Sequence, residues 1–224
     1  MYTVKKPRSA RRIIGSLLIS IMAILYIVSG VPRTVYRKYI IYKIGNGIDN
    51  CDASSTKPYL DKLYSLEPNN PETHFTYGLY YYLCKRDYLN AAAHFELSPY
   101  LEEVRDAHLY LCYSYLSLDR LKKTENCLKR HFAIHGNDPE AIFLAGMLEY
   151  TKGNLEKAYE YVEQAYYLVP NCRNLAYLVE IGHLIGDKEI QMHCIKLHGC
   201  DRRILSQYPL EDFVYKICFD DENR

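Results

Sequence analysis

The sequence predicts an all-α protein built from stacked helical hairpins. Gly78, Cys112 and Gly146 lie at intervals of 34 residues, and the same order of bulky, small and aromatic residues returns around each of them. Apolar residues between Leu109 and Leu116 recur at spacings of three and four, which is helical periodicity. Because one hairpin of this length cannot bury its own apolar face, neighbouring copies must stack into a solenoid with an open, curved surface.

The chain starts with a basic leader, residues 1–12, which is followed by an apolar segment, residues 13–31. No charged residue occurs from Ile13 to Val31, and the segment is close to the length that a helix needs to cross a bilayer. We therefore expect a single-pass membrane protein with a cytoplasmic N-terminus. The side of the membrane that the repeats occupy stays open, because four basic residues also follow the span closely: Arg33, Arg37, Lys38 and Lys43.

A cleavable signal peptide is the alternative for the same segment. The basic leader precedes an apolar core, and Val28-Ser29-Gly30 resembles a processing site. The apolar run is longer than the usual core of ~7–15 residues, and no Ala-x-Ala pattern precedes a mature end. These two features favour an uncleaved anchor.

Residues 32–56 are predicted to form a helix or linker next to the membrane. The segment is basic and rich in tyrosine at first, and it loosens at Gly45-Asn46-Gly47. Two interpretations stay open: the helix rests against lipid headgroups, where Tyr and basic residues are favoured, or it packs under the first hairpin.

The clearest repeat runs from Pro139 to Pro170 and resembles a tetratricopeptide repeat. Small residues stand where two helices touch, at Gly146 and Ala158, and a Gly153-Asn154 turn separates the helices. The resemblance implies a right-handed superhelix of antiparallel hairpins over residues 57–198. The three best copies are at about 71–104, 105–138 and 139–172, and degenerate copies flank them.

Two details of the repeats depart from the pattern. In the first of the three copies, Ala91 and Phe95 come one residue late, which suggests an insertion in the turn near Asp87, and Pro99 predicts a short second helix. Residues 199–224 carry an amphipathic pattern and are expected to cap the last hairpin, since the end of a solenoid needs a polar outer face.

The eight cysteines are expected to act mostly as packing residues. Cys112 occupies the small position between helices, and Cys127 and Cys194 stand at equivalent places on second helices, where a thiol serves as a compact apolar group. This interpretation favours a reducing compartment over disulfide formation.

The resemblance also implies where a partner would bind. In tetratricopeptide arrays the first helix of each hairpin lines the inner curve, and the side chains expected there are overwhelmingly apolar and aromatic. Such a surface suits a partner helix or an extended peptide with hydrophobic side chains. The predicted partner-binding residues are Phe75, Leu79, Tyr82, Leu109, Tyr110, Tyr113, Phe143, Leu144, Met147 and Tyr150.

Other classes of function find little support. The chain has 28 basic and 27 acidic residues, so no broad surface for nucleic acid is indicated. No catalytic motif occurs, and we expect neither an enzyme nor a cofactor. The one metal-ligand candidate is the set His193, Cys194, His198 and Cys200; its spacing matches no structural zinc pattern, so no metal site is predicted.

The sequence therefore predicts a membrane-anchored adaptor that holds a protein or peptide partner in an apolar, aromatic-lined groove, with no small-molecule substrate. Two alternatives remain. One is a structural subunit of a larger membrane assembly, whose inner curve is covered by a neighbour. The other, less favoured, is a metal-dependent enzyme.

Overall fold

The computed structural model describes residues 33–98, 105–187 and 190–197, together with residues 199, 200, 214, 217 and 218. All regular secondary structure in these residues is helical, which confirms the all-α prediction. The chain divides into two compact units, residues 1–73 and 74–224, and the boundary falls inside one helix.

The first unit contains a hairpin of α2 (Arg33–Asp49) and α3 (Ala53–Leu66). Isoleucines at positions 40, 44 and 48 of α2 are buried, as are Leu60 and Leu63 of α3. A Cβ atom at Gly47 would lie 2.0 Å from the Thr56 hydroxyl oxygen, so glycine lets the two helices touch. The segment that was expected to loosen is thus continuous helix packed on α3.

The prediction of a single-pass membrane protein is contradicted by the lengths and compositions of the described helices. Among the described residues no helix is both long and apolar enough to cross a membrane. The longest, α2, has 17 residues, or about 25 Å at 1.5 Å per residue, against a hydrocarbon core of about 30 Å. It also carries Arg37, Lys38 and Lys43. The predicted span, residues 13–31, lies outside the described residues.

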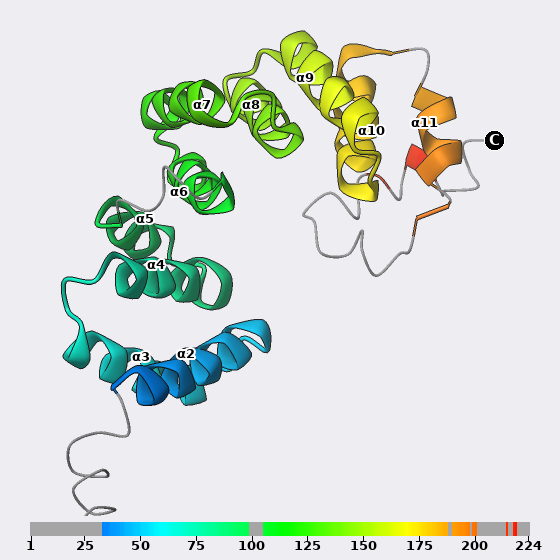
Figure 1. Cartoon of the computed structure of the whole chain (residues 1–224). Coiled ribbons are helices and arrows are strands. Elements are labelled where there is room, and N and C mark those ends of the chain that lie inside the picture. Colours follow the sequence, from blue (N-terminus) through cyan, green and yellow to red (C-terminus); the bar gives the residue numbers. More distant parts are fainter. Residues whose placement is uncertain are drawn as a thin grey trace, which may run out of the picture. The chain divides into compact units, whose positions relative to one another are not determined.

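The second unit is a succession of helices that pack in sequential pairs (Figure 1). A helix that starts in α4 continues as a π-helix, η1, before α5 begins. The pairs α6 and α7, α8 and α9, and α10 and α11 follow, and α9 also packs on α10. The bounds are α4 (Pro71–Leu79), η1 (Tyr80–Lys85), α5 (Tyr88–Glu96), α6 (Arg105–Ser117), α7 (Leu121–His135), α8 (Pro139–Thr151), α9 (Leu155–Leu168), α10 (Cys172–Ile185) and α11 (Ile190–Leu197).

The small residues that define the repeat lie where the two helices of each hairpin meet. A Cβ atom at Gly146 would lie 2.7 Å from Val162 Cγ2 and 3.2 Å from the Ala158 carbonyl oxygen. A Cβ atom at Gly78 would lie 2.4 Å from the ring of Phe95. Any larger side chain at these positions would push the paired helices apart.

In the second unit, a residue with positive φ follows the end of the first helix of each hairpin by one or two positions. These residues are Arg86, Asp119, Gly153 and Gly186, with φ values of 51°, 55°, 80° and 73°, at intervals of 33 or 34 residues. A residue in this left-handed conformation ends a helix and turns the chain. The hairpin geometry is therefore kept even where the repeat has Arg or Asp in place of Gly.

The extra residue of the first repeat lies in the helix and not in the turn. Eight positions separate Gly78 from Arg86, whereas seven separate Cys112 from Asp119. Between Gly78 and Arg86 the chain forms the π-helix η1, the form in which a helix takes up one additional residue. The insertion predicted near Asp87 is thus absorbed before the turn, and α5, with nine residues, is short as expected.

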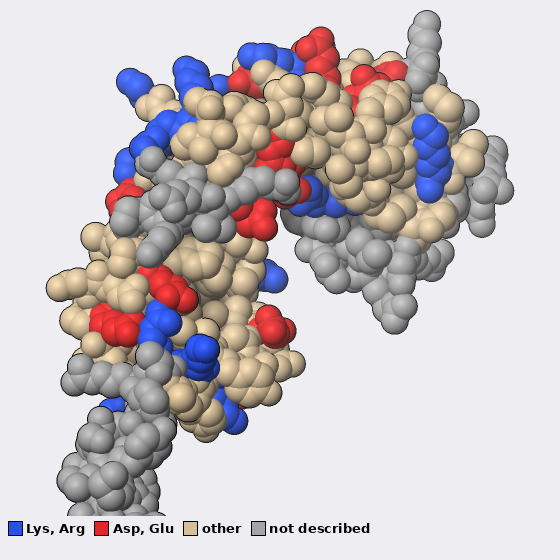
Figure 2. All heavy atoms as spheres, in the orientation of Figure 1, with Lys and Arg blue, Asp and Glu red and all other residues tan. Residues whose placement is uncertain are grey.

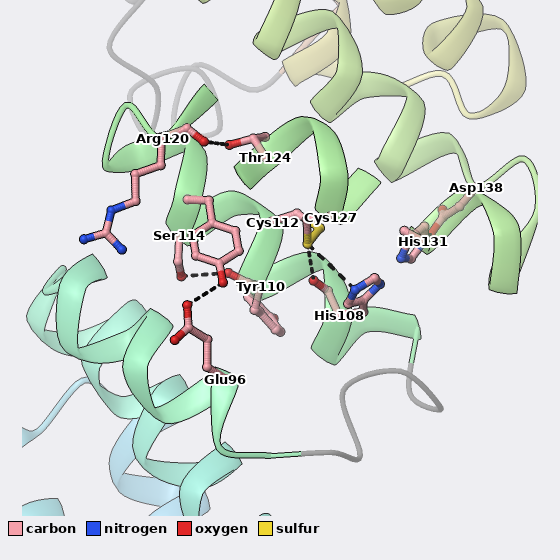
Figure 3. The surroundings of a disulfide bond; sticks show 11 residues. Glu96, His108, Tyr110, Cys112, Ser114, Arg120, Thr124, Cys127, His131 and Asp138 are labelled. Carbon is pink, nitrogen blue, oxygen red and sulfur yellow. Dashed lines mark hydrogen bonds and ion pairs between the residues drawn. A yellow bond between two sulfur atoms is a disulfide. The ribbon is translucent and has the colours of Figure 1, made fainter. Parts of the chain in front are cut away.

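The prediction that the cysteines are mostly reduced packing residues is wrong in this structure. Three disulfides join Cys112 to Cys127, Cys172 to Cys200, and Cys194 to Cys218. The first crosses the α6/α7 hairpin at the same small position that Gly78 and Gly146 occupy in the neighbouring hairpins, with a Cα to Cα distance of 5.5 Å (Figure 3). Close helix contact thus suits a disulfide as well as a glycine.

The last two disulfides tie the end of the chain to the last hairpin. Cys200 follows α11 and bonds to the first residue of α10, whereas Cys218 bonds to Cys194 on α11. Val214 is buried in the same cluster as Leu175 and Leu197. Most of the predicted capping segment, residues 199–224, lies outside the described residues.

Gly146→Ala should lower the free energy of unfolding by about 1–3 kcal/mol, because the added methyl group overpacks the contact with Val162. The measurement is urea denaturation followed by circular dichroism. Gly45→Ala is the control: it lies within α2 with open space around it, so alanine should stabilise by about 0.5–1 kcal/mol. If both substitutions changed the free energy of unfolding by the same amount, Gly146 would not lie at a close contact between helices.

Thiol titration of the denatured, unreduced protein should detect two thiols per chain, Cys51 and Cys84, because the other six cysteines are paired. After reduction all eight should react. Lysis and denaturation at acidic pH keep the thiols protonated, so that disulfides neither form nor exchange before the titration. Eight reactive thiols before reduction would contradict the pairing.

Candidate functional site

A pocket of about 730 Å³ opens on the first helices of successive hairpins in the second unit. Its walls come from η1, α6, α8 and α10, and half of the twelve lining residues are aromatic, five tyrosines and one phenylalanine. The lining residues are Tyr82, Tyr110, Tyr113, Leu116, Glu140, Phe143, Met147, Tyr150, Thr151, Arg173, Tyr177 and Glu180. A concave apolar surface with a few polar groups is the usual form of a ligand site.

The ten predicted partner-binding residues divide into three groups. Six line the pocket: Tyr82, Tyr110, Tyr113, Phe143, Met147 and Tyr150. Leu109 and Leu144 are buried in the core shared by α6, α7 and α8, with 4% and 0% of their surface exposed. Phe75 and Leu79 pack against the cluster around Phe95 and Ala107 and do not line the pocket.

One wall of the pocket is held by a charged pair. The Arg173 guanidinium donates to both carboxylate oxygens of Glu140, at 2.8 and 2.6 Å, and lies 4.0 Å from the centre of the Phe143 ring. The Tyr113 hydroxyl donates to the same Glu140 carboxylate. A bidentate pair stacked on a ring has little freedom, so α8 and α10 present a rigid wall.

A second carboxylate, Glu180, faces the pocket without such a partner. Its Oε1 atom accepts a hydrogen bond of 2.9 Å from the Tyr150 hydroxyl, whereas its Oε2 atom is buried and has no hydrogen-bond partner among the described residues. Burial raises the pKa of Glu180, and the hydrogen bond from Tyr150 opposes this shift in part. The carboxylate thus retains one acceptor oxygen that has no donor among the described residues.

The hydroxyls of Tyr113 and Tyr150 stay protonated and act as donors. Burial, together with the negative charge of Glu140, raises the pKa of Tyr113 well above its ordinary value. Burial and the bond to Glu180 raise the pKa of Tyr150 to about 12. At neutral pH the pocket therefore combines uncharged aromatic walls with the one carboxylate oxygen that lacks a donor.

Charge elsewhere on the described surface is mixed. On the face shown in Figure 2, acidic and basic side chains are interspersed among wide uncharged areas. This distribution agrees with the near balance of 28 basic and 27 acidic residues.

Of the four metal-ligand candidates from the sequence, His193, Cys194, His198 and Cys200, the two cysteines are not available as thiolates. Cys194 and Cys200 belong to two different disulfides, and His198 lies outside the described residues. A different set comes together on α6 and α7: one ring nitrogen each of His108, His131 and His135 lie within 4.8 Å of one another.

Sequence reasoning missed the residues from α10 and the histidine set. The copy of the repeat that contains α10 is degenerate. Its residues could not be aligned with the repeat pattern closely enough to select Arg173, Tyr177 or Glu180. A signal for the histidines was present: His131 and His135 are four residues apart, a spacing that puts two side chains on one face of a helix. His108 lies on the partner helix of the same hairpin.

Comparisons with known proteins bear on the fold. No protein-family model matches the chain, and no curated protein matches it. Among solved structures it is similar to TTC0263, a thermophilic TPR protein of Thermus thermophilus, with 13% identity over 80% of this chain and 97% of that one, at a TM-score of 0.63. It is also similar to MamA from Desulfovibrio magneticus RS-1, with 21% identity over 72% and 93% and a TM-score of 0.61.

A third similar structure is YrrB, a TPR protein described as having an unusual peptide-binding site, with 19% identity over 79% of this chain and 90% of that one, at a TM-score of 0.54. At this level of identity the likeness concerns the backbone alone. The described part of the chain therefore has the fold of the tetratricopeptide repeat proteins.

Proposed function

We propose that this protein is an adaptor that binds a peptide segment of a protein partner in the pocket of the second unit. The observation that supports the proposal most is the combination of aromatic walls with the unsatisfied Oε2 atom of Glu180. The fold supports it too, since one of the structural neighbours, YrrB, is named for a peptide-binding site. A membrane anchor has no part in the proposal.

The chemistry of the pocket favours a peptide with a basic side chain among apolar ones. The Glu140 carboxylate is already paired with Arg173, so Glu180 is the negative charge left for a ligand. A lysine or arginine of the partner would lay its aliphatic stem along the tyrosine rings and bring its charged end to Glu180. Cations bind well over aromatic faces, which adds to the attraction.

Peptide binding can be measured by fluorescence anisotropy with labelled apolar peptides that carry one central Lys, Arg, Gln or Glu. The Lys and Arg series should bind more tightly than the Gln and Glu series. Glu180→Gln should weaken binding of the Lys series about tenfold, or about 1.4 kcal/mol, and leave the Gln series unchanged.

A matched pair of tyrosine variants provides the control. Tyr177→Ala removes a pocket ring and should weaken binding of the Lys series about tenfold or more, whereas Tyr167→Ala removes an exposed ring of α9 outside the pocket and should not. Circular dichroism checks that both fold. The proposal would be contradicted if the parent protein and the Glu180→Gln, Tyr177→Ala and Tyr167→Ala variants all bound the Lys series equally well. It would also be contradicted if none of the peptide series bound.

Binding of the Lys peptides should also depend on pH. The carboxylate attracts a cation only when ionised, so affinity should fall as the pH is lowered through the pKa of Glu180. Because burial raises this pKa, the loss should start at a higher pH than for an ordinary glutamate. Glu180→Gln should give a flat profile over the same range. A parent profile equally flat would show that Glu180 does not contact the peptide.

A further inference from the structure

Three histidines of one hairpin come together in the second unit, away from the residues that line the pocket. His108 lies on α6, and His131 and His135 lie on consecutive turns of α7. The rings of His108 and His131 are stacked with centroids 5.4 Å apart, and those of His131 and His135 are 4.7 Å apart. His108 and His131 are buried, with 3% and 0% of their surface exposed, whereas His135 is partly exposed at the end of α7.

The carboxylate of Asp138 fixes the orientation of the central ring. Its Oδ2 atom lies 3.0 Å from His131 Nε2, and because an ionised carboxylate only accepts hydrogen bonds, this nitrogen carries the proton (Figure 3). The lone pair of the ring is then on Nδ1. Histidines that bind metals are held in this way by a carboxylate on the nitrogen that faces away from the ion.

The two outer rings contain nitrogens that the fold leaves unsatisfied. Nδ1 of His108 and Nε2 of His135 are buried and make no hydrogen bond within the described part of the chain. A buried polar atom without a partner costs about 1–3 kcal/mol, so a native protein normally supplies a water molecule or an ion in such a place.

We propose that His108, His131 and His135 form a binding site for a divalent transition-metal ion of the zinc type. Three neutral imidazoles are a common ligand set for Zn²⁺, with nitrogens at about 2.0–2.1 Å from the ion and hence about 3.3 Å from one another. The present nitrogens, within 4.8 Å of one another, reach that arrangement through small side-chain rotations. The ion enters beside His135, the ligand nearest to solvent.

The site does not require the neighbouring cysteines. Cys127 Sγ lies 3.8 Å from His108 Nε2, but Cys112 and Cys127 are joined to each other, and a disulfide sulfur is not a thiolate ligand. Asp138 also accepts a hydrogen bond from the Glu140 amide at the start of α8, so the cluster connects two hairpins. A bound ion should therefore stabilise the hairpin junction as well as α6 and α7.

The test uses the full chain without a histidine tag, with its disulfides intact, titrated with Co²⁺ and followed by visible absorption. One ion per chain should bind with the strong absorption of tetrahedral cobalt, and Zn²⁺ should displace it. His135→Ala, at the exposed end of α7, should weaken binding at least tenfold. Asp138→Asn keeps the helix cap and should weaken binding about 10–100-fold.

His183→Ala is the matched control, because it removes an exposed histidine of α10 and should leave the cobalt spectrum and affinity unchanged. Circular dichroism of each variant checks that the helices remain. No binding by the parent, or equal binding by the His135→Ala and His183→Ala variants, would overturn the proposal. Binding that appears only after reduction would also overturn it, because the ligands would then be the thiolates of Cys112 and Cys127.

Discussion

The close contact between the two helices of each hairpin is the constraint on which the rest of the second unit depends. At Gly78 and Gly146 there is no room for a Cβ atom, and at Cys112 the same position is bridged covalently to Cys127. Helices this close share one apolar core, and each hairpin can then stack on the next through residues such as Leu144 and Leu178. The stack brings side chains from η1, α6, α8 and α10 to one pocket.

The sequence predicted the hairpins where its repeat is regular. The 34-residue period identified the small contact positions, and the resemblance to tetratricopeptide repeats selected six of the twelve pocket residues. It did not identify Arg173, Tyr177 and Glu180, because the copy that contains them has few residues of the pattern. It assigned the inserted residue to a turn, since a pattern of spacings does not distinguish a longer turn from a π-helix, and only the backbone of residues 80–85 does.

The disulfides show a different limit of sequence reasoning. A buried cysteine at a small position looks the same in sequence whether it is a packing residue or half of a disulfide, because pairing depends on the distance to another cysteine in space. Cys112 and Cys127 are separated by 15 residues in sequence but by only 5.5 Å between their Cα atoms. The membrane prediction rested on residues 13–31 alone, and the described helices include none that fits a bilayer.

The pocket and the histidine cluster use the same hairpins for different chemistry. First helices present tyrosines and Glu180 on one side, whereas the histidines of α6 and α7 meet in the interior beside Asp138. Glu140 and Asp138 are two residues apart, and they take part in the pocket wall and the histidine cluster respectively. The start of α8 thus belongs to both.

Hydrogen–deuterium exchange with and without a bound lysine-containing peptide is the sharpest test of peptide binding in the pocket, because it reports which helices are protected by the ligand. We expect slower exchange confined to η1, α6, α8 and α10, whose side chains line the pocket, with α7 and α9 unchanged. Protection located on α7 and α9, with η1, α6, α8 and α10 unaffected, would contradict peptide binding in the pocket.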